Sequence, residues 1–170
     1  MSNVPAARVR VFVAAGSNID PERNLARACA EIAAFWPDVL FSRAYRNAAV
    51  GFDGPDFINL VLGFSTDQPL DLVLRRLQEI EMLCGRPRNA PKWASRAMDL
   101  DVLLYGDRVE KTPVYTLPRP DLLRRPYMLG PLAEIAADVM HPTANKSIGE
   151  LWREFDRDGH AMVPVTLAPR

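Results

Sequence analysis

The order of apolar segments along the chain limits its fold more than any other feature of the sequence. Four short segments are rich in β-branched and aromatic residues, which is typical of strands, and two longer ones carry apolar residues at helical spacing. The strands are predicted at residues 9–15, 39–46, 57–65 and 98–105, with a helix in the first and the last of the three gaps. The resulting order, β-α-β-β-α-β, predicts an α+β fold with a ferredoxin-like core, in which an antiparallel sheet carries both helices on one face.

Both helices have recognisable ends and one apolar stripe each. The first is expected to begin after Asp20 as its N-cap and to end before Pro37, and the second to begin near Pro69 and to end at Gly85. The stripes consist of Leu25, Ala28, Cys29, Ile32 and Trp36 in the first helix, and of Leu70, Val73, Leu74, Leu77, Ile80 and Cys84 in the second. These stripes predict that the helices cover one face of the sheet and leave the opposite face to a ligand.

The third strand shows which side chains face which way. Its apolar residues alternate, so Ile58, Leu60 and Leu62 are expected to meet the helices. Phe57 and Asn59 then point to the other face. An aromatic ring and a side-chain amide are what a flat heterocycle needs, because one offers a stacking surface and the other a hydrogen-bonding edge. Partly buried residues without a ligand remain an alternative for this pair.

Composition excludes several classes of protein. The chain has 170 residues, of which 48% are hydrophobic and 25% charged, so it is expected to form a single globular domain over 1–170. The core is expected at about 9–155, followed by a tail, 156–170. The 21 basic and 21 acidic residues cancel, which argues against a nucleic-acid coat or a membrane-binding surface. No apolar run is long enough for a membrane span, and the N-terminal segment does not look like a signal peptide, so we expect a cytoplasmic protein.

Cysteine, histidine and proline usage adds three expectations. Cys29 and Cys84 are too few for a disulfide framework and are expected as buried thiols. His141 and His160 offer little material for a histidine metal site or a catalytic triad. Fifteen prolines, crowded into the second half, predict a loop-rich C-terminal extension with one short helix at 147–155. Residues 161–167 fit either an edge strand or a disordered tail.

The fourth strand contains the most informative short motif, Asp99-Leu100-Asp101. Residues two apart share one face of a strand, so both carboxylates point the same way. Two carboxylates about 6 Å apart repel each other by about 3 kcal/mol at an effective dielectric constant of about 20, and therefore need a counter-charge. Oxygen ligands suit a hard cation such as Mg²⁺, which binds one or two carboxylates together with substrate phosphates. A solvated face of an edge strand is the alternative.

The segment before this motif supplies positive charge. Residues 85–96 contain Arg86, Arg88, Lys92 and Arg96 and no acid. Arginine forks suit phosphate oxygens, so the loop and the carboxylates together predict a site for a metal-bound polyphosphate. The alternative is a structural network in which the arginines only neutralise Asp99 and Asp101. No phosphate-binding glycine-rich motif is present, so side chains and metal have to hold the phosphates.

These motifs together resemble the signature of the 6-hydroxymethyl-7,8-dihydropterin pyrophosphokinase family of the folate pathway. The resemblance covers about residues 9–155. It rests on the run from Lys92 to Leu104, with its R-x-x-D-x-D pattern, and on landmarks in the expected order elsewhere. The landmarks are Gly16-Ser17-Asn18, Tyr45-Arg46, Gly51, Phe57-Ile58-Asn59, Gln78, Glu81, Gly85-Arg86, Leu117-Pro118, Arg125, Met128-Leu129 and Pro131-Leu132. The resemblance implies a ferredoxin-like fold and transfer of pyrophosphate from ATP to the pterin hydroxymethyl group, with release of AMP.

The resemblance also implies roles for single residues and the cofactors they serve. Asp99 and Asp101 match the ligands of two Mg²⁺ ions, and with Arg86 and Arg96 they make up the implied catalytic set. The implied ATP-binding residues are Gln78, Glu81, Arg88, Trp93, Thr116, Arg119 and Arg125. The implied pterin-binding residues are Asn47, Val50, Phe57, Asn59, Trp93 and Tyr127. The partners are then two small molecules, ATP and a reduced pterin, without nucleic acid or membrane, and we expect a monomer.

The chain departs from the family pattern at several positions. Arg119 stands where many members have histidine, and Asn89 replaces a frequent basic residue. Residues 47–50 replace a more proline-rich loop, Phe57 lacks the hydroxyl of the commoner tyrosine, and Tyr127 has one where phenylalanine is usual. Two alternatives therefore stand beside the enzyme: a catalytically weak paralogue that binds ATP or pterin, and a ferredoxin-like regulatory or nucleic-acid-binding module.

Overall fold

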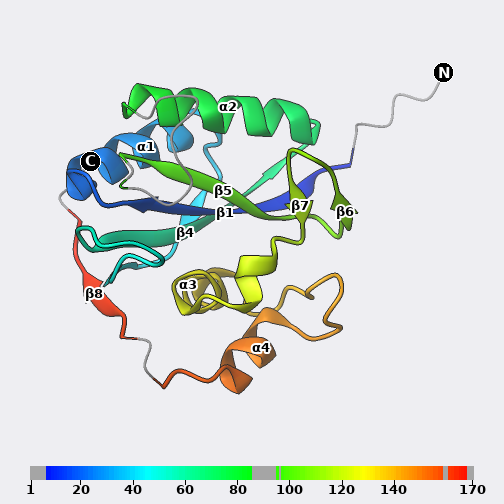
Figure 1. Cartoon of the computed structure of the whole chain (residues 1–170). Helices are drawn as coiled ribbons and strands as arrows, with labels where there is room; N and C mark the ends of the chain where they lie inside the picture. The colour runs from blue at the N-terminus through cyan, green and yellow to red at the C-terminus, as the bar shows by residue number, and fades with distance from the viewer. Residues whose placement is uncertain (1–6, 86–94, 96, 159–160, 168–170) are drawn as a thin grey trace.

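The computed structural model describes residues 7–85, 95, 97–158 and 161–167. An antiparallel sheet lies between two helical layers (Figure 1). One layer consists of α1 (Pro21–Phe35) and α2 (Leu70–Leu83), and the other of α3 (Pro126–Ala136) and α4 (Ile148–Glu154). No helix in the described ranges is long and apolar enough to cross a membrane.

The sheet follows the strand order β5-β1-β4-β3-β8, and β2 also pairs with β4. All of these pairings are antiparallel. The strands are β1 (Val9–Ser17), β2 (Leu40–Phe41), β3 (Ala44–Asn47), β4 (Phe57–Thr66), β5 (Asp99–Tyr105) and β8 (Val163–Val165). A separate hairpin of β6 (Glu110–Lys111) and β7 (Thr116–Leu117) follows β5, and a 3-10 helix, η1 (Pro120–Leu123), follows the hairpin. The mixed α and β architecture with an antiparallel sheet is as predicted.

The core between the sheet and the first helical layer matches the predicted pattern. Ile58, Leu60 and Leu62 of β4 are buried there against Leu25 and Ile32 of α1. The apolar residues that alternate with the two aspartates of β5, Leu100 and Val102, belong to the same core. Cys29 and Cys84 are buried free thiols, as expected. Period two therefore assigned the two faces of these strands correctly.

The opposite face of the sheet is not left open along its whole length, which corrects the expectation that helices cover one face only. A second core forms there from Phe12 of β1, Val61 of β4 and Leu103 of β5, packed against Met128 and Leu129 of α3. The proline-rich composition hid this helix. Pro126 is its first residue, where a missing N–H costs nothing, and Pro131 alone interrupts its interior. The second half is therefore more helical than predicted.

Two local predictions fail for identifiable reasons. The expected strand at 39–46 is split into β2 and β3, because the Ser42 hydroxyl accepts a hydrogen bond from the N–H of Val61 at 2.9 Å and so replaces a regular ladder bond. Asp20 does not cap α1 through its side chain. It lies in the left-handed region at φ 43°, and its side chain makes no capping hydrogen bond.

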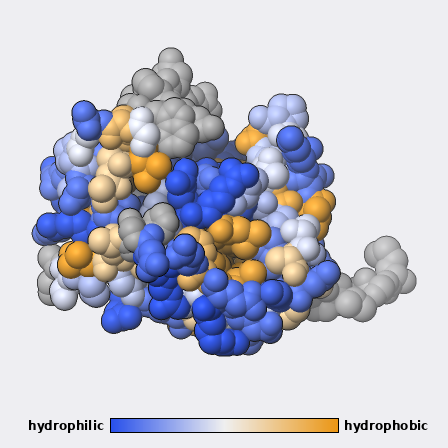
Figure 2. Space-filling view, turned by 60° about the horizontal axis from the view of Figure 1, so that its bottom comes forward, coloured by the Kyte–Doolittle hydropathy of each residue, from blue (hydrophilic) through white to orange (hydrophobic). Residues whose placement is uncertain are grey.

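The predictions for the end of the chain fit better. The Ser147 hydroxyl accepts a hydrogen bond from the N–H of Glu150 at 3.1 Å, so α4 begins with a side-chain cap where a short helix was expected. Of the two alternatives for 161–167, the edge strand applies to Val163–Val165, which pairs with β3. The face of the molecule in Figure 2 is mixed, with hydrophobic residues in small islands among hydrophilic ones.

Candidate active site

Asp99 and Asp101 lie in β5 next to two small residues of β1. Asp99 pairs with Gly16, and Asp101 pairs with Ala14. All four residues line one cavity with a volume of about 490 Å³. Because Gly16 and Ala14 have little or no side chain, this part of the sheet leaves room for the cavity beside the two carboxylates.

The cavity collects the predicted site residues from across the sequence. Every one of them that the structure describes lines it. These residues are Asn47, Val50, Phe57, Asn59, Gln78, Glu81, Asp99, Asp101, Thr116, Arg119, Arg125 and Tyr127. The remaining predicted residues, Arg86, Arg88, Trp93 and Arg96, lie outside the described residues, as do Asn89 and Lys92. The sequence order alone did not require the described set to meet in one place.

The surroundings of Asp101 disfavour its charged form. Burial, as the largest cause, and the charge of Asp99 together raise the pKa of Asp101 to about 7. Arg119 acts in the opposite direction, since its guanidinium lies 3.4 Å from Asp101. The same guanidinium lies 3.7 Å from Asp121, so one arginine connects a predicted metal ligand with a second carboxylate at the rim. The counter-charge that the Asp-x-Asp motif requires is therefore supplied in part by Arg119.

Glu81 connects α2 to the strand that carries the two aspartates. Its Oε2 accepts a hydrogen bond from the N–H of Leu100 at 2.8 Å, which ties α2 to β5 between the two aspartates. Its negative charge also contributes to the raised pKa of Asp101. Glu81 thus holds the strand that carries Asp99 and Asp101, whatever it does toward a ligand.

Asn59 occupies a place that Gly16 leaves free. A Cβ atom on Gly16 would lie 2.4 Å from Oδ1 of Asn59, so any larger residue would displace this amide. The Nδ2 of Asn59 donates to Oδ1 of Asn47 at 2.5 Å, and the Asn59 side chain is 8% exposed. The amide is therefore held in a fixed orientation at the cavity wall.

Aromatic rings complete this side of the cavity. Phe57 lines it, and Phe52 meets Phe57 edge to face with ring centroids 6.4 Å apart. Tyr127, the first-turn residue of α3, lines it as well, and burial raises the pKa of its hydroxyl. An amide beside aromatic rings is a suitable surface for a flat, hydrogen-bonding heterocycle.

Sequence reasoning missed several residues that line the cavity. They are Phe52 in the loop after β3, Leu74 and Leu77 in α2, Val114 and Tyr115 before β7, and Asp121 in η1. For Leu74 and Leu77 the apolar stripe of α2 indicated burial. The sequence contains no signal that these two residues border a cavity and not only the core. The sequence offers one signal for Asp121. It lies two residues after Arg119, which departs from the family pattern, so a nearby carboxylate is a natural partner for the added positive charge.

The donor atoms of the cavity fit a hard cation. Asp99 and Asp101 offer carboxylate oxygens only, as Mg²⁺ prefers. Within the described ranges, no group of three or more His, Cys, Asp or Glu side chains is arranged to hold a metal. Two carboxylates suit a cation that keeps part of its water shell and takes further oxygens from a phosphate substrate.

Comparison with known proteins points to one family. The family model of 7,8-dihydro-6-hydroxymethylpterin-pyrophosphokinase matches residues 12–137. A 2-amino-4-hydroxy-6-hydroxymethyldihydropteridine pyrophosphokinase from Synechocystis is 38% identical over 147 residues, which cover 85% of this chain and 75% of that protein. The Haemophilus influenzae enzyme of the same name is 35% identical over 152 residues, which cover 86% of this chain and 93% of that protein.

Solved structures agree in fold. The wild-type HPPK-DHPS of Plasmodium falciparum superposes with a TM-score of 0.65 at 12% identity, over 86% of this chain. A further HPPK-DHPS structure, in complex with substrates, gives a TM-score of 0.63 at 11% identity. The chain spans 41% and 43% of these two longer chains, so the similarity concerns one part of each.

Proposed function

The chain belongs to the 7,8-dihydro-6-hydroxymethylpterin-pyrophosphokinase family, and on this premise we propose how its cavity serves the family's reaction. It is a pyrophosphokinase of folate biosynthesis. It transfers the pyrophosphoryl group of ATP to the hydroxymethyl group of 6-hydroxymethyl-7,8-dihydropterin and releases AMP. The observation that carries the assignment of residues is that all predicted site residues in the described ranges line one cavity.

We propose that the cavity has a pterin side and a nucleotide side. Phe57, Asn59, Tyr127, Asn47 and Val50 form the pterin side, where the rings stack on the pterin and the Asn59 amide reads its edge. Gln78, Glu81, Thr116, Arg119 and Arg125 form the nucleotide side. Arg86, Arg88, Trp93 and Arg96 lie outside the described residues, and we keep for them the roles toward ATP and pterin that the resemblance implies. The positions of Asn59 and Arg119 support this division, because each is held by a neighbour at the cavity wall.

Asp99 and Asp101 would hold Mg²⁺, and we propose two ions. When bound, the ions neutralise negative charge on the phosphates of ATP. The protein itself contributes position and charge. We propose that the cavity holds the pterin hydroxyl next to the β-phosphate of ATP. The hydroxyl oxygen bonds to the β-phosphorus as the bond from that phosphorus to the AMP oxygen breaks, and the hydroxyl proton leaves to solvent. Arg119 and Arg125 offset the charge that develops on the departing AMP. The chemistry of phosphoryl transfer asks for such positioning more than for a covalent catalyst.

Three further features belong to the proposal. We assign the β1-α1-β3-β4-α2-β5 part to a ferredoxin-like core, with the residues after Gly106 as an extension, because the sheet order β5-β1-β4-β3 fits it. We propose a monomer. We place the enzyme in the cytoplasm, which the two free thiols support, since thiols stay reduced there.

Product identity tests the proposal most directly. The protein is incubated with ATP, Mg²⁺ and 6-hydroxymethyl-7,8-dihydropterin, and the nucleotides and pterins are separated. We expect AMP and pterin diphosphate in equal amounts. The variant Asp101→Asn keeps the side-chain shape and is expected to be inactive, while Asp107→Asn, at an exposed turn away from the cavity, is the matched control. ADP as the nucleotide product, or intact ATP when both ligands bind, would contradict the proposal.

A further inference from the structure

The β6–β7 hairpin and the turn between its strands supply part of the nucleotide side of the cavity. Val114, Tyr115 and Thr116 line the cavity from this hairpin, and Leu74 and Gln78 line it from α2. The side chain of Val114 is apolar yet 79% exposed. A flat ligand that covers this side chain would remove its apolar surface from water, and this burial would favour binding. The distance between hairpin and helix therefore decides what fits between them.

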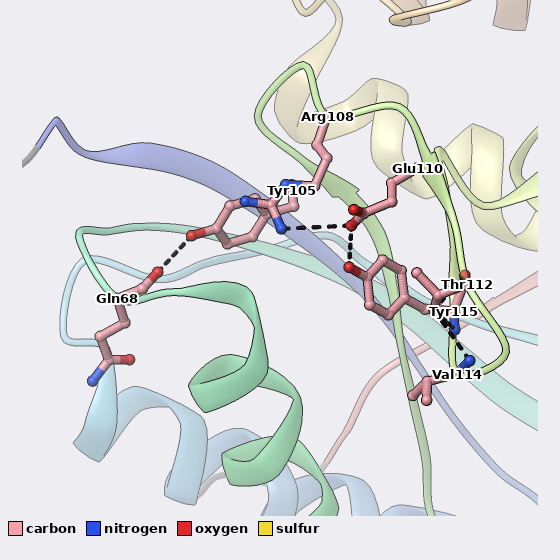
Figure 3. A network of polar contacts seen from close by, with 7 residues as sticks. All are labelled: Gln68, Tyr105, Arg108, Glu110, Thr112, Val114 and Tyr115. Atoms are coloured by element: carbon pink, nitrogen blue, oxygen red, sulfur yellow. Dashed lines mark hydrogen bonds and ion pairs between the residues drawn. The ribbon is translucent and has the colours of Figure 1, made fainter.

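The hairpin is too short to fix its own position. Each of its strands has two residues, and Glu110 pairs with Leu117 and Lys111 with Thr116. Isolated two-stranded hairpins are marginally stable at best, even when they are longer than this. Contacts outside the ladder have to hold it in place. Figure 3 shows such contacts on the side of the hairpin that faces the end of β5.

A chain of polar and ring contacts runs from the approach to α2 to the cavity wall (Figure 3). The Tyr105 hydroxyl donates to the carbonyl of Gln68 at 2.5 Å, two residues before α2 begins. The Arg108 guanidinium lies 4.8 Å above the Tyr105 ring and 3.8 Å from Oε1 of Glu110. The Tyr115 hydroxyl donates a hydrogen bond to Oε1 of Glu110, and this hydrogen bond raises the pKa of Tyr115.

The turn of the hairpin is fixed separately. The Thr112 hydroxyl accepts hydrogen bonds from the N–H groups of Val114 and Tyr115, each at 3.1 Å. The N–H of Thr112 donates to the carbonyl of Tyr115 at 2.8 Å. These bonds make the turn one rigid unit with the Tyr115 ring. The Tyr115–Glu110 contact then connects that unit, through Arg108, to Tyr105 at the end of β5.

We propose that Glu110 and Tyr115 are positioning residues that set the separation of the two nucleotide-side walls and so tune the affinity for ATP. The inference rests on the proposed function, because it takes the ligand between these walls to be the nucleotide. The pterin side depends on β3, β4 and α3, none of which takes part in this network. A change in the network is therefore expected to act on ATP and leave pterin binding alone.

The chain contains a matched control for this network. On α2, Arg76 pairs with Glu79 at 2.9 Å, and the Arg76 guanidinium lies 4.0 Å above the Phe35 ring. The side chains of this pair are 41% and 48% exposed, against 41% and 45% for Arg108 and Glu110. Neither Arg76 nor Glu79 lines the cavity. Removing Glu79 therefore removes the same kind of surface contact without touching the wall.

The experiment compares four variants with the wild type: Tyr115→Phe, Glu110→Ala, Glu110→Gln and Glu79→Ala. Steady-state rates give KM and kcat for each substrate, and calorimetry gives the Kd for ATP without pterin. We expect Tyr115→Phe and Glu110→Ala to raise the KM and Kd for ATP by about threefold to tenfold, the usual effect of one hydrogen bond. The kcat and the KM for pterin should stay within about twofold. Glu110→Gln should recover part of the affinity, since its amide oxygen still accepts from Tyr115.

The outcomes separate the inference from the proposed function. A wild-type protein that forms no AMP and pterin diphosphate would refute the function. An active wild type with an unchanged ATP affinity in Tyr115→Phe would overturn the inference. Equal losses for ATP and pterin, or a loss in Glu79→Ala as large as in Glu110→Ala, would overturn it as well, because they indicate general destabilisation. Should Tyr115→Phe fold poorly, the comparison of Glu110→Gln with Glu110→Ala decides alone.

Discussion

The two faces of the sheet differ in packing, although the same strands form both: one is filled by the main core, and the other borders the cavity. Toward α1 and α2, β1 presents Val11 and Val13, which are completely buried in the main core. Toward the other face, the side chains of β1 become smaller along the strand, from Phe12 through Ala14 to Gly16. Phe12 packs in the α3 core, while Ala14 and Gly16 line the cavity. One face is closely packed, which stabilises the fold. On the other face the core ends where the side chains of β1 become too small to fill the space, and the cavity begins there.

The largest expected effect comes from the charges of the cavity face. Asp99→Asn keeps the shape of the side chain and removes one of the two carboxylates that we assign to Mg²⁺. We expect kcat to fall by about a thousandfold or more, because charge neutralisation supplies much of the barrier reduction in phosphoryl transfer. Rates of AMP formation and the circular dichroism spectrum check this. A folded variant with near-normal turnover would contradict the assignment of catalysis to the carboxylates of the cavity face.

A change on the core face should show the opposite pattern. Leu62 of β4 is completely buried against the first helical layer. Leu62→Ala leaves a cavity in this layer, and we expect the free energy of unfolding to drop by about 2–5 kcal/mol. The KM values of the folded fraction should be unchanged, since Leu62 lies on the far side of the strand from the site. Urea denaturation and kinetics at low temperature measure the two effects, and a large change in KM would show that the faces are coupled.

Gly16 tests the link between small side chains and the pterin side. A Cβ at this position would lie 2.4 Å from Oδ1 of Asn59. Gly16→Ala is therefore expected to displace the Asn59 amide and to raise the KM for pterin by about tenfold or more, with the KM for ATP much less affected. The double variant with Asn59→Ala provides the check. If the amide is the reason, Gly16→Ala should add little in that background, and fully additive losses would contradict the explanation.

The sequence predicted those parts of the molecule that follow local rules. Period two placed Ile58 and Leu60 in the core and Asp99 and Asp101 on the opposite face, because successive side chains of a strand alternate. The same local rules misread Asp20, whose left-handed backbone was not visible in the sequence. They also missed the helix at 126–136, since proline composition outweighed the apolar spacing of Met128, Leu132 and Ala136. Local signals fail where one side chain or one packing partner overrides the propensity.

The candidate site shows a similar limit. The family resemblance named residues from β3, β4, α2, β5, β7 and α3, and the described ones line a single cavity. The resemblance did not include the side chains that hold these residues in place. Glu110 and Tyr115, to which we assign the support of the nucleotide wall, are not among its residues. It names Glu81 for ATP alone and does not reveal that this carboxylate accepts a hydrogen bond from the backbone of Leu100. Such supports depend on contacts between distant elements, and neither spacing nor periodicity encodes them.

The smallest expected effect concerns His141, in the connection between α3 and α4 behind the cavity face. Its ring is 3% exposed, and Nδ1 accepts hydrogen bonds from the N–H groups of Thr143 and Ala144 at 3.2 and 3.1 Å. Both partners are donors, so a proton on Nδ1 would break the turn, and burial lowers the pKa of His141 below its ordinary value. The unfolded chain therefore binds this proton more readily than the folded one. The contribution is fully present above the unfolded pKa of about 6.5 and decreases as the pH falls from there toward the folded pKa.

His141→Asn isolates this effect, because an asparagine oxygen can accept from the same backbone N–H groups without titrating. We expect the free energy of unfolding of the wild type to fall more steeply between pH 7 and pH 5 than that of the variant. The difference in slope cannot exceed about 1.4 kcal/mol per pH unit, the value for one proton. Urea denaturation across this range measures it. Parallel curves would mean that the turn tolerates the charged ring, and the face that carries α3 would then be less rigid than its packing indicates.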